Sequence, residues 1–396
     1  MRFLYCFLLV IALPALVAAQ TVNITGKVTS TDILGPLAKA SVFLTNSTFG
    51  TSTAADGSFT LYDVKPGQYE LVVTYVGYES HHQTILVGSK PIELKIEMHL
   101  KSFDLQAVNI VRHPFSPENF ANFVKYFLGT SDNAKKCKIL NPTAIDLYYN
   151  TYDKALTGRA DEFIVIENKS LGYKLKYLLN EFKYDGINQI ISYGGQPLFE
   201  DLKGSKRQIA NWQKRREETF YGSSMHFYRS LMHNNLSEQG FEIYQLIRKP
   251  NKERPPQVVI VKNIDKFLAQ GNIDSANHWK ELYNLTRYHE TLIKQPYSAN
   301  DIVRKTDQPG LFAFTFPDCL YVMYKKKFDN DLTSNVYRPL NMPNYFSTIV
   351  TLYQPYAVFD MNGVVISSKS TLYEGAWSHD NIADLLPVDY APGDKK

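Results

Sequence analysis

The residues whose types and spacing best suit chemistry lie in the stretch 205–236, which is predicted to be helical with a glycine break at Gly222. If the helix continues through Gly222, one face of it carries a stripe of cationic and aromatic side chains. The stripe consists of Arg215, Gly222, His226, Arg229 and His233, with Tyr221 beside it. Such a face could bind an anionic sugar or a lipid headgroup, but its two histidines are two turns apart, about 10 Å by helix rise, which is too far to share one metal ion. The alternative, which we weigh more heavily, is a solvated face whose histidines make local hydrogen bonds.

The sequence contains two incomplete zinc-binding motifs of the kind found in metal-dependent hydrolases. His278 and Glu281, followed by His379, have the ligand types of a zinc peptidase, but no glutamate follows His379 to act as general base. A second zinc pattern opens at His289-Glu290 and lacks its next histidine. We also find no nucleophile elbow, phosphate loop or dinucleotide fingerprint. The sequence therefore predicts no catalytic residue, no metal site and no cofactor, and we expect a protein that is not an enzyme.

Cys137 and Cys319 are the two cysteines outside the apolar N-terminal run, which contains Cys6. An oxidising compartment would allow one disulfide between Cys137 and Cys319. Two separate buried thiols are the alternative, and both interpretations stay open.

Residues 1–19 have the features of a secretory signal peptide. Arg2 precedes an apolar run from Phe3 to Val17, and small residues stand before Gln20. No later stretch reaches the about 18–20 uncharged apolar residues that span a bilayer, so we expect export without a transmembrane helix in the mature chain. The formal net charge of +4 is too small to indicate nucleic-acid binding.

Residues 20–111 are predicted to form a small β-sandwich. Apolar residues alternate with polar ones in short segments, for example at Tyr69, Leu71 and Val73, which places one face of each strand on a core. Asp56-Gly57 and Pro66-Gly67 supply tight turns between segments. About seven strands in roughly 90 residues are typical of a sandwich.

The same stretch contains a series of short motifs. They are Gly26-Lys-Val28, Gly35-Pro36-Leu37, Ala40-Ser-Val42-Phe-Leu44, Gly50-Thr-Ser-Thr53, Asp56-Gly57-Ser-Phe59-Thr-Leu61, Val64-Lys-Pro66-Gly67-Gln-Tyr69 and Tyr75-Val-Gly77-Tyr78. This series resembles the carboxypeptidase-regulatory-like domain, a transthyretin-like sandwich that Bacteroidota attach to many proteins of the cell envelope. The resemblance implies an accessory module for binding or stability, in the periplasm or at the outer membrane.

The remaining chain is predicted to be a linker at 112–118 and an α+β domain at 119–396. Two prolines interrupt the linker, and Ser116-Pro117-Glu118 is typical of a helix start, with Gly129 as its end. Alternating apolar residues from Cys137 to Leu202, and again at 311–324 and 346–366, predict antiparallel sheets with a few helices. The expected fold class is thus mainly β, a seven-stranded sandwich followed by an α+β domain.

Three runs in the second domain resemble a companion segment of the same envelope proteins, to which no activity is assigned. They are Asn133–Cys137, Ile166–Tyr173 and Leu386–Tyr390. We therefore predict a non-enzymatic envelope protein whose partner is an outer-membrane protein or a glycan. Two alternatives stay open. One is an unrecognised hydrolase of glycan or peptide, which requires titratable residues clustered in a pocket. The other is a small outer-membrane barrel built from residues 137–390.

Overall fold

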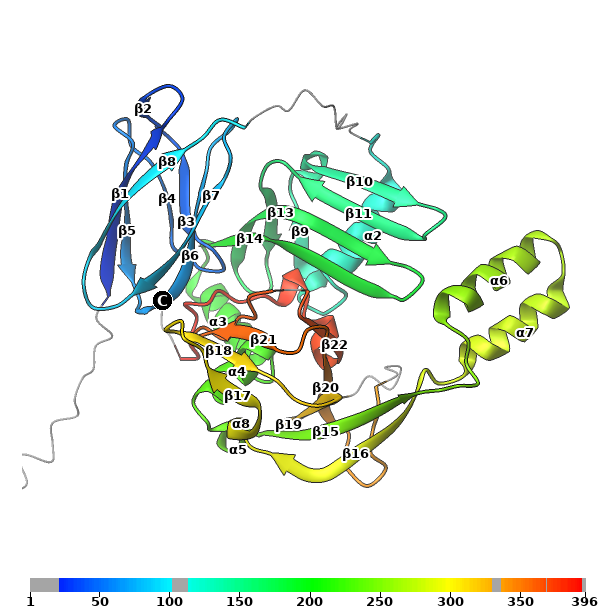
Figure 1. Cartoon of the computed structure of the whole chain (residues 1–396). Helices are drawn as coiled ribbons and strands as arrows, with labels where there is room; N and C mark the ends of the chain where they lie inside the picture. Colours follow the sequence, from blue (N-terminus) through cyan, green and yellow to red (C-terminus); the bar gives the residue numbers. More distant parts are fainter. Residues whose placement is uncertain (1–20, 102–112, 330–335, 368, 394–396) are drawn as a thin grey trace, which may run out of the picture. The chain divides into compact units, whose positions relative to one another are not determined.

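The computed structural model describes residues 21–101, 113–329, 336–367 and 369–393, so the predicted signal peptide lies outside the described residues (Figure 1). The chain divides into two compact units. The first unit comprises the chain up to Leu44 together with Phe49–Ser102, and the second comprises Thr45–Thr48 together with Phe103–Lys396. Each unit is described separately below.

The first unit is a sandwich of two antiparallel-rich sheets. Its strands are β1 (Val22–Ser30), β2 (Gly35–Pro36), β3 (Ser41–Leu44), β4 (Gly50–Ser52), β5 (Ser58–Val64), β6 (Gly67–Thr74), β7 (His81–Val87) and β8 (Ile92–Met98). In one sheet β1 pairs with β2, β5 and β8, and in the other the order is β4-β3-β6-β7. The described part of this unit has eight strands rather than the predicted seven, because Gly35–Pro36 pairs briefly with the end of β1.

The core of the sandwich follows from the period-two pattern of its strands. Ile24 and Val28 of β1, and Leu71 and Val73 of β6, are fully buried. The predicted turn after Asp56 forms, and Gly57 adopts φ +79°, a backbone conformation that glycine adopts without strain. The predicted sandwich is therefore confirmed.

The second unit contains a six-stranded antiparallel sheet covered by a helix. The strands are β9 (Cys137–Ile139), β10 (Ile145–Asn150), β11 (Ala155–Ala160), β12 (Ile164–Asn168), β13 (Tyr173–Asp185) and β14 (Ile190–Asp201), and the helix is α2 (Pro117–Phe127). Strands run in the order β10-β11-β13-β12-β9, and β14 also pairs with β13. The Ser116 side chain accepts a hydrogen bond from the Asn119 amide and caps α2, as predicted. Phe123 and Phe127 of α2 are fully buried, with their rings against Phe182 of β13.

Two further antiparallel sheets complete the second unit. The larger has the order β16-β15-β19-β20-β22, and the smaller the order β17-β18-β21. Their bounds are β15 (Phe241–Pro250), β16 (Tyr288–Tyr297), β17 (Val303–Lys305), β18 (Leu311–Phe314), β19 (Cys319–Phe328), β20 (Tyr345–Leu352), β21 (Ala357–Asp360) and β22 (Thr371–Gly375). A second apolar core lies between these strands and α4 (Ser224–Met232), centred on Phe227, Phe314 and Trp377.

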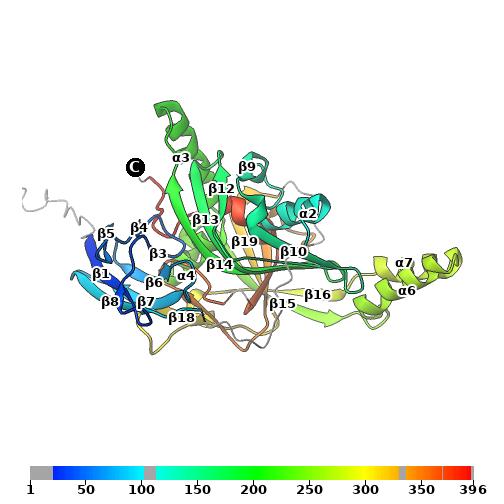
Figure 2. The ribbon, with the colours of Figure 1, turned by 90° about the horizontal axis from the view of Figure 1, so that it is seen from above.

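The remaining helices connect the sheets. They are α3 (Lys206–Phe220), α5 (Leu236–Gln239), α6 (Gln257–Ala269), α7 (Ile273–Asn284) and α8 (Ala299–Ile302), with short 3₁₀ turns η1 (Ala134–Lys136), η2 (Pro142–Ala144), η3 (Ala376–His379) and η4 (Ile382–Asp384). Helices α6 and α7 form a hairpin at the far end of the β15–β16 ribbon (Figures 1 and 2), where Lys154, in the turn after β10, pairs with Asp265 of α6 at 2.7 Å. The fold is mainly β with several antiparallel sheets, as the sequence predicts.

The predicted helical stretch 205–236 is interrupted at Gly222, where the sequence indicated a glycine break, and it does not continue through this residue as a single helix. Gly222 has φ +89° and separates α3 from α4. A side chain at Gly222 would meet the Tyr324 ring at 2.8 Å, and the Gly222 carbonyl accepts a hydrogen bond from Trp377 Nε1 at 2.8 Å. Tertiary contacts therefore fix the break, and α3 and α4 present different faces to their surroundings.

Candidate functional site

A cavity of about 940 Å³ opens in the second unit, within the size range of small-molecule sites. We call it the polar cavity. Its walls come from the loop after α2, the end of α3, the start of α4, strands β19 and β20, and the η3–η4 segment. The lining residues are Ser131, Asp132, Asn133, Arg215, Glu218, Thr219, Tyr221, Ser223, Gln239, Tyr324, Lys326, Lys327, Asp329, Phe346, Gly375, Ala376, His379, Asp380 and Asp384.

Five acidic residues line the polar cavity, and burial raises the pKa of two of them, Asp380 and Asp384. Asp384 accepts hydrogen bonds from Ser131 Oγ and from Asn133 Nδ2, each at 2.7 Å, and burial raises its pKa. The Asp380 carboxyl has no hydrogen bond or ion pair with any described residue. Burial raises the pKa of Asp380 to about 7, with a further increase from the Asp384 charge and a decrease from Lys327. Near neutral pH, Asp380 can therefore both donate and accept a proton.

Cationic and aromatic groups line the cavity as well. Lys327 Nζ lies 4.3 Å from the ring centroid of Phe346, and Lys326 Nζ donates to the Glu238 carbonyl at 3.1 Å. Neither ammonium group has a carboxylate partner within 4.0 Å among the described residues. Tyr221 is 43% exposed. The cavity thus offers hydrogen-bond donors, acceptors and aromatic faces to one ligand.

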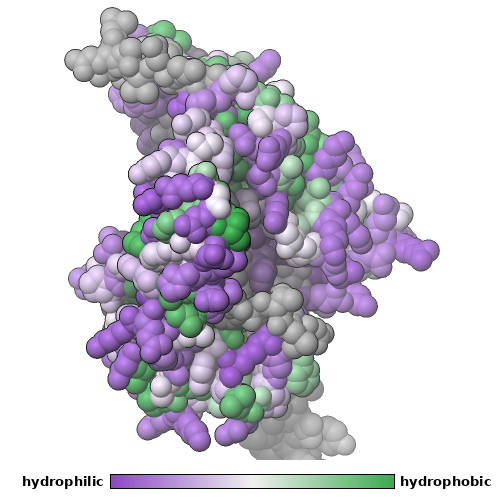
Figure 3. Space-filling model, turned by 90° about the vertical axis from the view of Figure 1, so that its right-hand side faces the viewer, coloured by the Kyte–Doolittle hydropathy of each residue, from purple (hydrophilic) through white to green (hydrophobic). Residues whose placement is uncertain are grey.

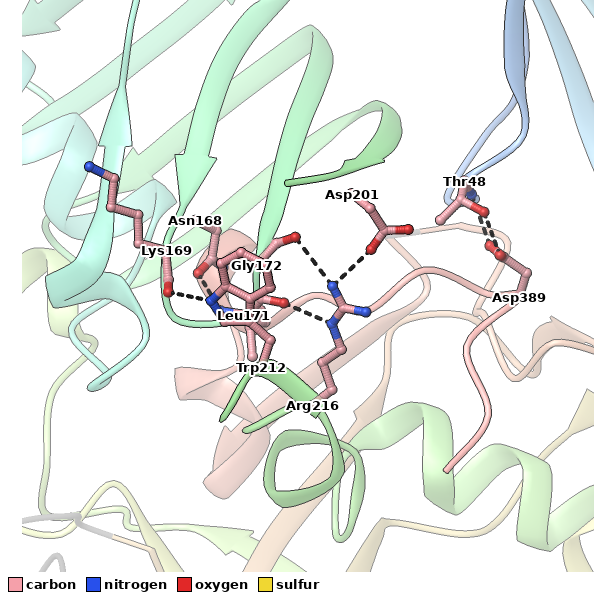
Figure 4. Close-up of polar contacts among 9 residues, drawn as sticks. All are labelled: Thr48, Asn168, Lys169, Leu171, Gly172, Asp201, Trp212, Arg216 and Asp389. Carbon is pink, nitrogen blue, oxygen red and sulfur yellow. Dashed lines mark hydrogen bonds and ion pairs between the residues drawn. The ribbon is translucent and has the colours of Figure 1, made fainter. Parts of the chain in front are cut away.

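Helix α3, which brings Thr219 and Tyr221 to the cavity, is anchored by Arg216 (Figure 4). Arg216 is 8% exposed, and its Nε donates to the Leu171 carbonyl at 2.7 Å. Its Nη2 donates to the Gly172 carbonyl at 3.2 Å and to Asp201 at 2.9 Å. One turn earlier, the indole nitrogen of the α3 tryptophan donates to a carbonyl of the same loop at 3.0 Å. The position of α3 is therefore set by buried polar contacts.

The C-terminal segment after η4 is held in the same unit by a second polar network. Asp389 accepts from the Thr48 amide at 2.8 Å and from Thr48 Oγ1 at 2.6 Å (Figure 4). Arg229 donates to the carbonyls of Val388 at 2.7 Å and Tyr390 at 2.9 Å. Arg229 is thus a structural residue that fixes this segment beside α4.

His226 is also a structural residue. Its Nδ1 accepts from the Gly222 amide at 3.1 Å, and its Nε2 lies 3.0 Å from Gln239 Oε1. Burial lowers the pKa of His226, so both contacts are those of a neutral ring. The two ring nitrogens of His226 therefore contact the α3–α4 break at Gly222 and Gln239 of α5.

The break between α3 and α4 divides the residues of the predicted ligand-binding stripe between two helices, and ligand binding by these residues stays a prediction. Two of the five side chains line the polar cavity, two are used in structural contacts, and one is exposed at the end of α4. Arg215 and Tyr221 line the polar cavity, His226 and Arg229 make the contacts described above, and His233 is exposed.

Cys137 and Cys319 are free thiols in the structure, so the disulfide considered from the sequence is not formed. Cys137 packs against the core under α2, whereas Cys319 belongs to a separate apolar cluster on the β15–β19–β20 sheet. The two side chains therefore serve as buried or half-buried apolar residues in different places. This is the second of the two alternatives.

The zinc patterns find no support in the described residues. His278 and Glu281 lie on α7, and His379 lies in η3. Within the described ranges, no group of three or more His, Cys, Asp or Glu side chains is placed to hold a metal ion. In the same part of the chain, no helix has the length and apolar character needed to cross a membrane.

Asp380 and Asp384 were not predicted from the sequence. Their spacing of four residues is visible there, but nothing local marks it, because their surroundings come from residues about 250 positions earlier in the chain, Ser131 and Asn133. The only sequence-level signal was the conditional one, that a hydrolase would need titratable residues clustered in a pocket.

The fold of the first unit defines its class, a β-sandwich domain. Residues 24–110 match the family model of the CarboxypepD_reg-like domain, so the chain contains this domain, as its motifs indicated. The domain is a non-catalytic fold. A search of curated proteins finds no match to the chain.

Similarity to solved structures is weak. One is a cohesin–X-dockerin complex from Acetivibrio cellulolyticus, with 22% identity, a TM-score of 0.18, and coverage of 19% of this chain and 56% of that chain. The alignment thus spans little more than half of that protein.

Two others come from Bacteroides. A DUF3823 family protein from Bacteroides ovatus has 11% identity, a TM-score of 0.17, and coverage of 46% of this chain and 82% of that one. A Bacteroides fragilis protein described as membrane-associated and of unknown function has 10% identity, a TM-score of 0.17, and coverage of 90% and 93%.

Proposed function

We propose that the chain is an exported, non-enzymatic protein of the cell envelope that binds a saccharide in the polar cavity, with the sandwich as an accessory module for binding or stability. One observation carries the proposal: a cavity of about 940 Å³ combines the unpaired Asp380 carboxyl with ammonium groups and aromatic faces.

The chemistry of the lining matches a polyhydroxylated ligand. Sugar hydroxyls donate to carboxylates such as Asp384 and accept from ammonium groups such as Lys326 and Lys327. The apolar faces of sugar rings pack against aromatic rings such as Phe346. An apolar small molecule would leave these charges without partners, which is costly.

The envelope location rests on the predicted signal peptide and on the CarboxypepD_reg-like domain at residues 24–110. The non-enzymatic assignment rests on the missing catalytic motifs. An outer-membrane protein partner of the sandwich is compatible with both.

A glycan microarray probed with the labelled full-length mature protein tests the proposal. We expect a selective set of oligosaccharides to bind, and Phe346→Ala to weaken that binding because the aromatic face is lost. Phe115→Ala is the matched control, since Phe115 is 55% exposed and does not line the polar cavity. An array without selective binding, or equal loss in the two variants, would argue against a saccharide site in this cavity.

Hydrolysis of a glycosidic bond is a second candidate, favoured by the Asp380–Asp384 pair. One carboxyl that is protonated near neutral pH beside a second carboxyl is the arrangement used for general acid and base. Release of new reducing ends from the array-selected oligosaccharide, abolished by Asp380→Asn, would support hydrolysis. Intact oligosaccharide after long incubation would leave binding as the function.

A further inference from the structure

A second cavity adjoins the polar cavity in the same unit. It measures about 640 Å³, and Ser223, His379, Asp380 and Asp384 line both. The carboxyl pair therefore stands at the boundary between the two. We call the second one the apolar cavity.

The apolar cavity has many more aliphatic side chains in its walls than the polar cavity, together with polar residues such as Lys125, Gln189 and Ser192. Half-buried aliphatic and thioether side chains line it from several elements, β14, α4, the turn after β21, β22 and the segment after η4. They include Ile190, Ile191, Met225, Val364, Leu372 and Leu385. Half-buried apolar groups on a concave surface gain free energy when a ligand covers them.

The face in Figure 3 is largely hydrophilic, with separate hydrophobic patches between polar residues. Scattered apolar residues of this kind are normal for a protein surface. The apolar cavity is distinguished by its concavity and by its junction with charged groups.

We propose that the ligand is an amphiphile, a saccharide that carries an aliphatic chain, whose sugar occupies the polar cavity and whose chain occupies the apolar cavity. This inference rests on the proposed saccharide function and names the chemical class of its ligand. Asp380 and Asp384 line both cavities, so they mark the place where one ligand would extend from the polar cavity into the apolar cavity.

Calorimetric titration with n-hexyl, n-heptyl and n-octyl β-D-glucoside, each below its micelle concentration, tests the inference on the full-length protein. We expect the affinity to rise about fourfold for each added CH₂, the fold-change that corresponds to ~0.8 kcal/mol of burial. A flat dependence on chain length would overturn the inference. Equal affinity for 1-octanol and octyl glucoside would also overturn it, because the sugar would then contribute nothing.

Variants separate the tail site from the sugar site. Leu372→Asn and Ile190→Asn place a polar group in the apolar cavity from β22 and β14, and each should remove the chain-length dependence. Ile293→Asn, on β16 and outside both cavities, should leave it unchanged. Chain-length dependence that survives in both cavity variants would contradict the assignment. If the affinity of the Asp380→Asn variant still rises with alkyl chain length and no oligosaccharide on the glycan array binds, the saccharide proposal fails and a binding site for aliphatic chains remains.

Discussion

Arg216 should contribute far more to stability than its neighbour Arg215. Arg216→Ala removes hydrogen bonds to two loop carbonyls and to Asp201, and it removes a guanidinium that lies 3.7 Å from the Tyr173 ring centroid. Arg215 is half-exposed and pairs with a glutamate one turn away on the same helix.

The expected loss of stability follows from the carbonyl groups that each substitution leaves without a hydrogen-bond donor. The Gly172 carbonyl keeps a second donor, the Leu202 amide at 2.9 Å, so it stays satisfied. The Leu171 carbonyl loses its donor inside the protein, which costs about 1–3 kcal/mol. Loss of the cation–π contact and of the remaining hydrogen bonds adds about 1–2 kcal/mol. We expect a total of about 3 kcal/mol for Arg216→Ala and at most about 0.5 kcal/mol for Arg215→Ala.

Urea unfolding followed by tryptophan fluorescence measures this difference in the full chain, because all three tryptophans belong to the second unit. Arg216→Lys keeps the charge with fewer donors and should fall between Arg216→Ala and wild type. A loss below about 1 kcal/mol for Arg216→Ala, or equal losses for the two alanine variants, would refute the reasoning that α3 is anchored through Arg216.

Three other outcomes can be checked with the same preparation. The pKa of Asp380 is raised from 3.8 to about 7 in the folded state, so its contribution to stability is present at low pH and is lost as pH rises through about 7. Between about pH 5 and pH 8, the Asp380→Asn variant should therefore lose less stability than the wild type. Equal losses for the two proteins in urea titrations would contradict this. Gly172→Ala puts a Cβ 2.2 Å from the indole ring of the α3 tryptophan at a positive φ and should lower the stability by about 3 kcal/mol. Gly271→Ala has a similar φ and no atom within 4 Å of the added Cβ, so it should lower the stability by about 1 kcal/mol. Equal shifts of the urea midpoint in the two variants would argue against the close packing at Gly172. Burial raises the pKa of the Cys137 thiol to about 12 and also raises that of Cys319. Both thiols should therefore react slowly with an alkylating reagent in the folded protein, and completely after unfolding without reductant. A mass spectrum of the unfolded protein in which neither cysteine is alkylated would indicate a disulfide.

Local signals were sufficient for the sandwich and for α2. Period-two alternation and turn dipeptides such as Asp56-Gly57 depend on neighbouring residues alone, and so do the Ser116 cap and the terminating Gly129. These features were predicted because each residue needs only its own segment to adopt its observed conformation.

Features set by distant residues were not predicted. The sequence indicated the glycine break at Gly222 but not the contacts with Tyr324 and Trp377 that fix it. Helix α6 begins with a β-branched run, Val258–Val261, that favours a strand by propensity. The carboxyl pair gains its chemical character from burial between segments far apart in the chain, which a sequence pattern does not record.

The central claim is that the polar cavity is a saccharide site. Crystals of the full-length protein with the strongest array-selected oligosaccharide test it most directly. We predict electron density for a sugar ring within hydrogen-bond distance of Asp380 or Asp384 and packed against Phe346. A sugar bound elsewhere on the chain, with this cavity filled by ordered water alone, would contradict the account.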